Sequence, residues 1–242
     1  MRGRKVLPMA IVYILVVSVI LGVACIGNEV TSVLAARVPL PRSNTIVIDA
    51  GHGGEDGGAV SCTGHLESGY NLEISLKLRD LLHLLGYSTG MIRTEDTSVY
   101  KEGVTIAAKK VSDLKERVRM VNETENAILI SIHQNTYSDS RYRGAQVFYG
   151  PKGESHALAE AMQRTFCETI NPGSNRKIKK ADGIYLMQHI DCTGILVECG
   201  FLSNPQEEAL LRSNDYHRKL VCVIGGTLSQ FLTDASRADI MR

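Results

Sequence analysis

Apolar and polar positions along the chain follow two alternating patterns, one typical of strands and one typical of helices. Runs of β-branched and aliphatic residues bounded by glycines or polar residues predict buried strands. We expect them at residues 45–50, 87–92, 127–133, 145–149, 183–187 and 194–199. Apolar residues that recur every three or four positions predict amphipathic helices. These are expected at residues 68–85, from Ser112 to about 121, and at 155–170, 205–212 and 215–232.

The alternation of strands with helices predicts the fold class. It indicates a single α/β domain, with a mostly parallel, twisted sheet of about six strands and helices on both faces. We expect this domain at residues 45–235, after a linker at 28–44 that contains two prolines. In such sheets, ligands bind beyond the carboxyl ends of the strands.

The N-terminus predicts a hydrophobic helix that associates with a membrane. A basic cluster at residues 1–5 precedes an uncharged, mostly apolar run from Val6 to Gly27. At a rise of roughly 1.5 Å per residue, this run can span the ~30 Å core of a bilayer. Residues 1–27 are therefore expected to be an uncleaved membrane anchor, or a signal segment cleaved near Ala35. Because the basic flank stays cytoplasmic, the domain is expected to be exported to the outer face of the cytoplasmic membrane.

Composition excludes several classes of function. The formal net charge is only +1, so the chain lacks the basic surface typical of nucleic-acid binding, and we expect no nucleic-acid partner. Tryptophan is absent and aromatic residues make up 5% of the chain, which disfavours an aromatic stacking platform. The six cysteines include no CxxC pair, so a zinc-finger spacing is absent as well.

Chemically active side chains fall at the ends of three predicted strands. His52 follows the first strand, His133 ends the third, and Glu198 lies in the last. Glu67 precedes the first helix of the domain. Two imidazoles, a ligating carboxylate and a free carboxylate are the groups that a hydrolytic zinc site requires, because zinc takes three protein ligands and keeps a position for water. Single histidines are more often structural, and His65 is an alternative ligand beside Glu67.

Other catalytic motifs are absent or incomplete. The glycines around His52 do not form a phosphate-binding G-x-x-x-x-G-K-[ST] motif, and a tight turn alone also explains them. There is no G-x-S-x-G elbow. Ser112 and Lys115 match S-x-x-K, but its companion motifs are missing. Covalent catalysis is therefore not expected.

Three sequence blocks resemble those of a known family. The stretches 49–59 (DAGHGGEDGGA), 131–135 (SIHQN) and 197–204 (VECGFLSN) resemble the signature blocks of the zinc-dependent N-acetylmuramoyl-L-alanine amidases of the Amidase_3 type. Leu66-Glu67 with the following NLEI resembles the block that supplies the carboxylate ligand. The resemblance covers residues 45–232. It implies that His52, Glu67 and His133 bind Zn²⁺, with Glu67 preferred over His65, and that Glu198 is the general base.

Two further stretches resemble the germination-specific, spore-cortex branch of this family. They are residues 113–118 (DLKERV) and 141–149 (RYRGAQVFY). Ala50, Thr136 and Cys199 depart from the usual pattern, but none of these departures removes a ligand or the base. Cys199 lies beside Glu198 in sequence, where its oxidation or capture of metal would disturb the site.

The resemblance implies hydrolysis of the amide between N-acetylmuramic acid and L-alanine in peptidoglycan. In the spore cortex this reaction would allow muramic δ-lactam to form, and some members of the family require an activating lipoprotein as partner. From position alone, Asn135 and Arg143 are candidates for substrate binding, although a structural role for Asn135 and solvation of Arg143 remain open. The alternatives are a zinc peptidase or carboxypeptidase acting on stem peptides, and a catalytically silent wall-binding or regulatory protein.

Overall fold

The computed structural model describes residues 44–240, with side chains up to residue 235. Six strands form one sheet in the order β2-β1-β3-β6-β4-β5. They are β1 (Thr45–Ala50), β2 (Ser88–Met91), β3 (Ala127–Asn135), β4 (Gln146–Tyr149), β5 (Lys179–Lys180) and β6 (Thr193–Phe201). Neighbouring strands are parallel, except that β4 runs antiparallel to β6. The predicted fold class is confirmed.

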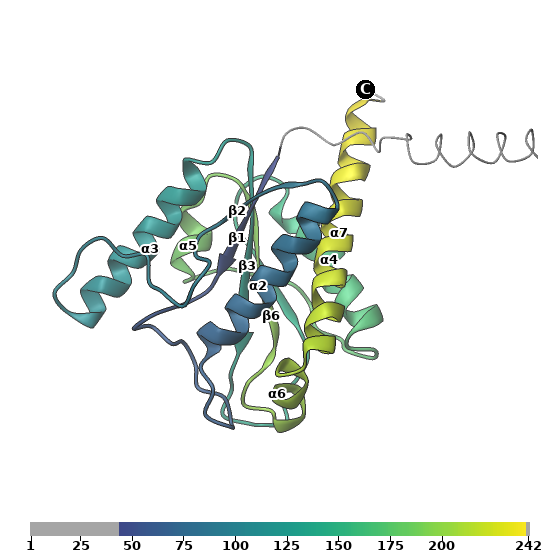
Figure 1. Ribbon diagram of the computed structural model, residues 1–242. Coiled ribbons are helices and arrows are strands. Elements are labelled where there is room, and N and C mark those ends of the chain that lie inside the picture. The colour runs from purple at the N-terminus through teal and green to yellow at the C-terminus, as the bar shows by residue number, and fades with distance from the viewer. Residues whose placement is uncertain (1–43, 241–242) are drawn as a thin grey trace, which may run out of the picture. The chain divides into compact units, whose positions relative to one another are not determined.

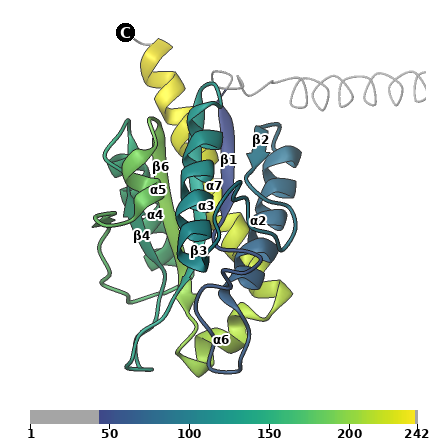
Figure 2. The ribbon, with the colours of Figure 1, turned by 90° about the vertical axis from the view of Figure 1, so that its left-hand side faces the viewer.

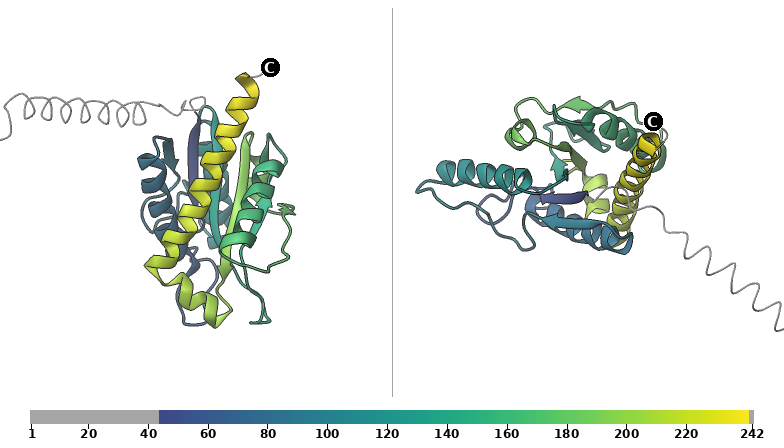
Figure 3. Two further views of the ribbon diagram at one scale, coloured as in Figure 1. Left: turned by 90° about the vertical axis from the view of Figure 1, so that its right-hand side faces the viewer. Right: turned by 90° about the horizontal axis from the view of Figure 1, so that it is seen from above.

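Helices cover both faces of the sheet (Figure 1). One face packs against α2 (Glu67–Leu84), α4 (Ser155–Thr169) and α7 (Asn214–Ile240) in the larger apolar cluster. The other face packs against α3 (Ile106–Asn122) and α5 (Tyr185–His189) in a smaller one. Figure 2 shows α3 and α5 in front of the sheet, and the left view of Figure 3 shows α7 crossing the opposite face. The short α6 (Pro205–Leu211) lies at the end of the domain where the parallel strands finish.

The strand order creates a reversal point at this end of the sheet. From β1 the chain runs outward to β2 and then returns to form β3 on the other side of β1. Such a reversal is where α/β sheets bind ligands, because the loops that follow the two inner strands turn in opposite directions. Here His52 follows β1 and His133 lies near the end of β3, so the fold brings both histidines to the reversal point.

The prediction of a strand at residues 183–187 is wrong. This segment turns at Gly183, whose φ is +82°, and then forms the helix α5. Leu186 and Met187 are buried in the smaller apolar cluster. A short apolar run does not distinguish a strand from a buried helical turn, and here the packing decides it. The edge strand instead forms at Lys179–Lys180, where the sequence shows no apolar run.

The helix predicted to begin at Ser112 begins earlier. α3 starts at Ile106, and the side chain of Thr105 caps it by accepting a hydrogen bond from the Ala108 backbone at 3.1 Å. Ser112 lies within this helix, where its hydroxyl oxygen accepts hydrogen bonds from two backbone N–H groups of the preceding loop, those of Lys101 and Glu102. The first turns of α3 carry exposed residues, so apolar periodicity does not mark them.

The expected membrane anchor or signal segment at residues 1–27 lies outside the described residues, as does the expected linker at 28–44 except for its last residue. Within residues 44–240, none of the helices combines the length and apolar character needed to cross a membrane.

Candidate active site

The loop after β1 holds His52 in a backbone conformation that few side chains adopt. Its φ is +62°, in the left-handed region. The carbonyl oxygen of His52 accepts a hydrogen bond from Arg117 at 2.8 Å. The carbonyl of Ala50 accepts from both Arg93 and Arg117, and that of Gly51 accepts from Arg93 at 3.0 Å. Two buried guanidinium groups therefore fix three consecutive carbonyls of this loop.

A buried ion pair stabilises the position of Arg117 beside this loop. Arg117 contacts Asp49 and Asp113, each at 2.5 Å, and both Arg117 and Asp49 are almost fully buried. Burial alone would raise the pKa of Asp49, but Arg117 and the hydroxyl of Ser131 outweigh it and hold this pKa below its usual range. The carboxylate therefore stays ionised beside Arg117, and no local pattern in the sequence indicates that these two residues meet.

Three predicted metal ligands converge at the reversal point. The ligand atoms of His52, Glu67 and His133 all lie within 4.8 Å of one another. Glu67 Oε2 lies 3.3 Å from His52 Nε2, and its Oε1 lies 3.0 Å from His133 Nδ1. The two imidazole rings are 5.0 Å apart between centroids. The loop after β1, the strand β3 and the first turn of α2 thus each bring one side chain to the same point.

Hydrogen bonds orient the Glu67 carboxylate. Its Oε2 accepts from the backbone N–H of Ala59 at 3.0 Å. Its Oε1 accepts from the backbone N–H of Gln134 at 3.1 Å and from the side chain of Asn71 at 3.2 Å. Glu67 is only 4% exposed. The surrounding backbone thus fixes the carboxylate, so it does not need the metal to hold its orientation.

The electrostatics of the cluster favour the ionised form of Glu67 and the protonated form of His52. Burial would raise the pKa of Glu67, but its hydrogen bonds to His133 and His52 outweigh burial and lower this pKa strongly. Burial likewise lowers the pKa of His52, and its contacts with Glu67 and Asp56 outweigh that and raise it. A carboxylate that stays ionised beside imidazole nitrogens is a suitable ligand for a cation.

Glu198 lies on β6 in register with His133 on the neighbouring β3. Part of the residue is accessible, but its Oε2 atom is buried and has no hydrogen-bond partner among the described residues. Burial raises the pKa of Glu198 to about 7, with a further contribution from the charge of Glu67. A carboxyl group with this pKa can both accept and release a proton near neutral pH.

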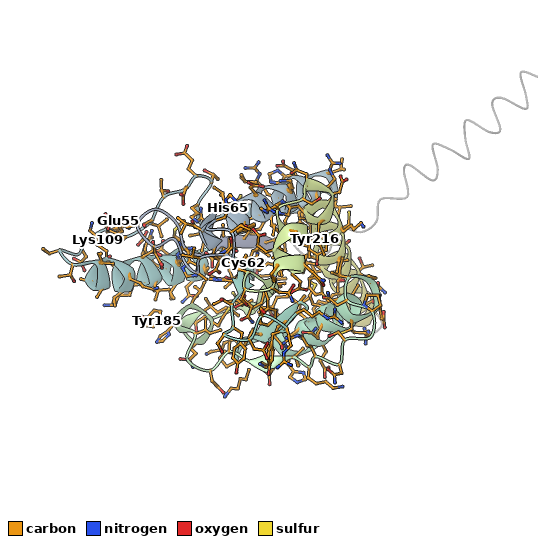
Figure 4. The ribbon with its side chains drawn as sticks, turned by 90° about the horizontal axis from the view of Figure 1, so that it is seen from below. Glu55, Cys62, His65, Lys109, Tyr185 and Tyr216 are labelled. Carbon is orange, nitrogen blue, oxygen red and sulfur yellow. The ribbon has the colours of Figure 1, made fainter. Side chains whose placement is uncertain are left out.

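A second carboxylate, which the sequence analysis did not single out, contacts the His52 ring. Asp56 Oδ2 lies 3.0 Å from His52 Nδ1 and 3.1 Å from Nζ of Lys110 on α3. The adjacent Glu55 pairs with Lys109 at 2.7 Å. Figure 4 views this end of the domain and shows Glu55 beside Lys109. The only sequence signal for Asp56 was its place four residues after His52 in the glycine-rich loop.

The remaining candidates lie outside the ligand cluster. His65 packs against the Tyr70 ring at 6.3 Å and does not join the three ligands. Asn135 ends β3, two residues after His133. Arg143 is exposed and lines a separate cavity. Cys199 is fully buried in the larger apolar cluster, where burial raises the pKa of its thiol, so oxidation or metal capture at this residue is not favoured.

The donor set fits a divalent transition metal. Two imidazoles and one carboxylate form one of the ligand sets that hydrolytic zinc proteins use, and such sites leave a position for water or substrate. Glu198 has an unpartnered carboxylate oxygen, and hydrolases of this kind use a free carboxylate of this type. An α/β sheet with these groups at the carboxyl ends of its central strands is typical of the metal-dependent hydrolases.

Comparison with known proteins identifies the family within this class of hydrolases. The family model described as N-acetylmuramoyl-L-alanine amidase, Amidase_3, matches residues 46–228. A germination-specific N-acetylmuramoyl-L-alanine amidase of Bacillus subtilis is 37% identical over 198 residues, which cover 81% of this chain and 83% of that protein.

Solved structures agree with this match. The CwlD amidase from Clostridioides difficile, in complex with the GerS lipoprotein, superposes with a TM-score of 0.75 at 35% identity, and the match covers 78% of this chain and 98% of that one. An N-acetylmuramoyl-L-alanine amidase from Clostridium difficile 630 gives a TM-score of 0.67 at 27% identity and covers 78% and 97% of the two chains.

This chain belongs to the Amidase_3 family of N-acetylmuramoyl-L-alanine amidases. It is therefore an amide hydrolase of peptidoglycan, and the resemblance seen in its sequence blocks is confirmed.

Proposed function

We propose that this protein is a zinc-dependent amidase that cleaves the bond between N-acetylmuramic acid and the L-alanine of the stem peptide. The observation that carries the proposal is the position of Glu198. It pairs in register with His133, and its unpartnered, buried oxygen lies beside the His52–Glu67–His133 cluster. A purely structural cluster would not require a free carboxylate at this point.

In this proposal His52, Glu67 and His133 hold the zinc ion. When bound, zinc would polarise the scissile carbonyl and make a water molecule easier to deprotonate. Glu67 is pre-oriented by the backbone N–H groups of Ala59 and Gln134, so it contributes a fixed negative charge without reorganisation.

Glu198 acts as the general base and then as the general acid. Its pKa of about 7 allows it to take a proton from the attacking water near neutral pH. It then transfers this proton to the nitrogen of the departing L-alanine, so the peptide leaves as a free amine. Asn135, two residues beyond His133 at the end of β3, is proposed to contact the substrate.

The biological setting is proposed from the relatives. The similarity to a germination-specific amidase supports action in the spore cortex, where removal of the stem peptide would allow muramic δ-lactam to form. The C. difficile relative was solved with a lipoprotein, which supports an activating lipoprotein as a partner. We further propose that residues 1–27 anchor the protein at the outer face of the cytoplasmic membrane or direct its export.

The test compares the wild type with Glu198→Ala. Each protein is incubated with purified spore peptidoglycan, with and without added zinc, and the released peptides are analysed by mass spectrometry. We expect zinc-dependent release of stem peptides with a free L-alanine amine, and loss of this release in the variant. Metal content is measured in both proteins, because the substitution should leave zinc binding intact.

The other outcomes have distinct meanings. Cleavage of free stem peptide without cleavage at the sugar would identify a zinc peptidase. Equal cleavage by both proteins would exclude Glu198 as the base. If both proteins bind zinc and neither cleaves, even when a cognate lipoprotein is added, the protein is a silent wall-binding or regulatory member of the family.

A further inference from the structure

A large cavity lies at the same end of the domain as the active site but contains none of its ligands. Its volume is about 920 Å³, and three segments form its wall: the loop after β3, the loop after α4, and the region around α6. In Figure 1 α6 marks this end of the domain. Sites for small ligands commonly have volumes of roughly 300–1,000 Å³. The cavity is therefore large enough for part of a substrate.

Three arginines line this cavity, and their environments differ. Arg141 is at the rim and pairs with Asp139 at 2.7 Å. Arg176 is held in place, because it donates to the carbonyl of Arg143 at 2.8 Å and its guanidinium lies 4.8 Å from the Phe201 ring centroid. The guanidinium of Arg143 makes no hydrogen bond or ion pair to any residue that the structure describes.

Both acidic groups in the cavity wall are already engaged, and Asp139 forms the ion pair with Arg141. Glu207 is buried, and it accepts hydrogen bonds from the backbone N–H groups of Gly144 and Phe201, each at 2.8 Å. Its carboxylate therefore holds two backbone segments together and does not neutralise Arg143 through a direct contact. The wall thus presents one guanidinium fork that is free to bind a planar anion such as a carboxylate.

Contacts across the sheet connect this cavity with the catalytic residues. Arg176 donates to the side chain of Gln146 at 3.1 Å, and Gln146 pairs directly with Glu198 across β4 and β6. Adjacent strands are about 4.8 Å apart. Phe201, beneath Arg176, pairs with Asn135 at the end of β3. A peptide in extended conformation advances about 3.3–3.6 Å per residue, so two residues span more than one such interstrand spacing.

We propose that this cavity is the subsite for the stem peptide, and that Arg143 binds one of its carboxylates. The inference rests on the proposed function, because it assumes that the scissile amide lies at the His52–Glu67–His133 cluster. Beyond L-alanine the stem carries the carboxylates of D-glutamate and of the following diamino acid. Arg143 would make the enzyme select acidic stems over stems in which these carboxylates are amidated.

Direct binding tests this subsite separately from catalysis. The ligand is the free tripeptide L-alanyl-γ-D-glutamyl-diaminopimelic acid, which contains no bond for the amidase to cut. Its affinity for the full-length, zinc-loaded protein in mild detergent is measured by calorimetry, beside a tripeptide with amidated carboxyl groups. The variants are Arg143→Gln, Arg143→Lys and the control Arg218→Gln. Arg218 is exposed on α7 and pairs only with Asp215 among the described residues.

We expect Arg143→Gln to weaken binding of the acidic tripeptide about 10-fold to 100-fold, the range for loss of a hydrogen bond to a charged group. Arg143→Lys should retain part of the affinity, and Arg218→Gln should match the wild type. The wild type should bind the amidated tripeptide as weakly as Arg143→Gln binds the acidic one. On intact muropeptides, Arg143→Gln should raise KM and leave kcat unchanged.

Two results would overturn the inference. One is equal affinity of the wild type for acidic and amidated tripeptides, or no binding of either. The other is an Arg143→Gln variant that binds the acidic tripeptide like the wild type. Failure of the wild type to cleave peptidoglycan would count against the proposed function instead, and the tripeptide affinities would still decide whether the subsite exists.

Discussion

The Nδ1 atom of His52 lies 3.0 Å from Oδ2 of Asp56, while its Nε2 atom faces Glu67. A carboxylate behind a ligating imidazole fixes the tautomer and the ring orientation, and loss of such a partner typically reduces metal affinity 10-fold to 100-fold. We therefore expect Asp56→Asn to weaken zinc binding by about this factor, measured by competition with a chromophoric chelator.

The neighbouring carboxylate provides the control for this prediction. Glu55 pairs with Lys109 on α3 and forms no hydrogen bond or ion pair with His52. Glu55→Gln should therefore leave zinc affinity unchanged. An Asp56→Asn variant with the zinc affinity of the wild type would show that the hydrogen bonds of Glu67 alone position the site.

The raised pKa of Glu198 predicts that the free energy of unfolding of the metal-free protein falls as pH rises towards 7. Burial raises its folded-state pKa from 4.5 to about 7, so the folded protein binds more protons than the unfolded chain between these values. The contribution of this group to the free energy of unfolding is therefore fully present below pH 4.5 and is lost as pH rises through 7. The loss is about 3 kcal/mol at most, at 1.36 kcal/mol per pKa unit.

Glu198→Gln removes this titration. In EDTA, urea unfolding of residues 41–242 should show the wild type losing stability relative to the variant as pH rises from 5 to 8. A constant difference between the two proteins across this range would mean that Glu198 keeps an ordinary pKa in the fold.

Arg117 supplies no metal ligand, but its substitution is expected to reduce stability strongly. Arg117→Gln leaves Asp49 buried without its cationic partner, and removing one member of a buried ion pair typically costs about 3–5 kcal/mol. Arg119→Gln on the same helix is the control, since Arg119 is half-exposed and its surface ion pairs contribute about 0–1 kcal/mol. Urea denaturation of the three proteins measures both values, and similar losses in the two variants would contradict the prediction.

Alanine substitutions at two glycines distinguish a steric effect on the site from the effect of backbone strain alone. Gly58 has a φ of +70°, and a Cβ there would lie 2.7 Å from both Glu67 Oε2 and His52 Cδ2. Gly64 has a φ of +90°, but a Cβ there would meet no atom within 4 Å. Both alanine variants introduce strain of roughly 1–2 kcal/mol. Only Gly58→Ala should also lower zinc affinity, measured by the same chelator competition, and equal affinities in the two variants would exclude this steric effect.

The convergence of His52 and His133 could be predicted from the sequence because strand pattern and chemistry coincide there. The apolar runs of β1 and β3 end beside glycine and polar residues, so His52 and His133 could be assigned to strand ends. Parallel neighbours then bring such ends together. Glu67 required the family resemblance, because nothing in the local pattern distinguishes it from His65 as a ligand.

The supporting residues could not be predicted in the same way. Arg93 and Arg117 lie in polar segments, and arginine is mostly exposed in proteins, yet each is only 3% exposed here. Their burial follows from long-range contacts with loop carbonyls and with Asp49, which no local pattern encodes. The error at α5 has a similar origin, since its two apolar residues fit either a strand or a helix until α3 packs beside them.

The hydrogen bonds from Arg93 and Arg117 to the carbonyls of residues 50–52 have a consequence for how the metal is acquired. These bonds form within the protein, so folding of the domain alone shapes the His52 loop. Small zinc domains, by contrast, fold only when metal is bound. Here the metal's binding free energy is not consumed in ordering the chain, and chelation should yield a folded protein that recovers its activity when zinc returns.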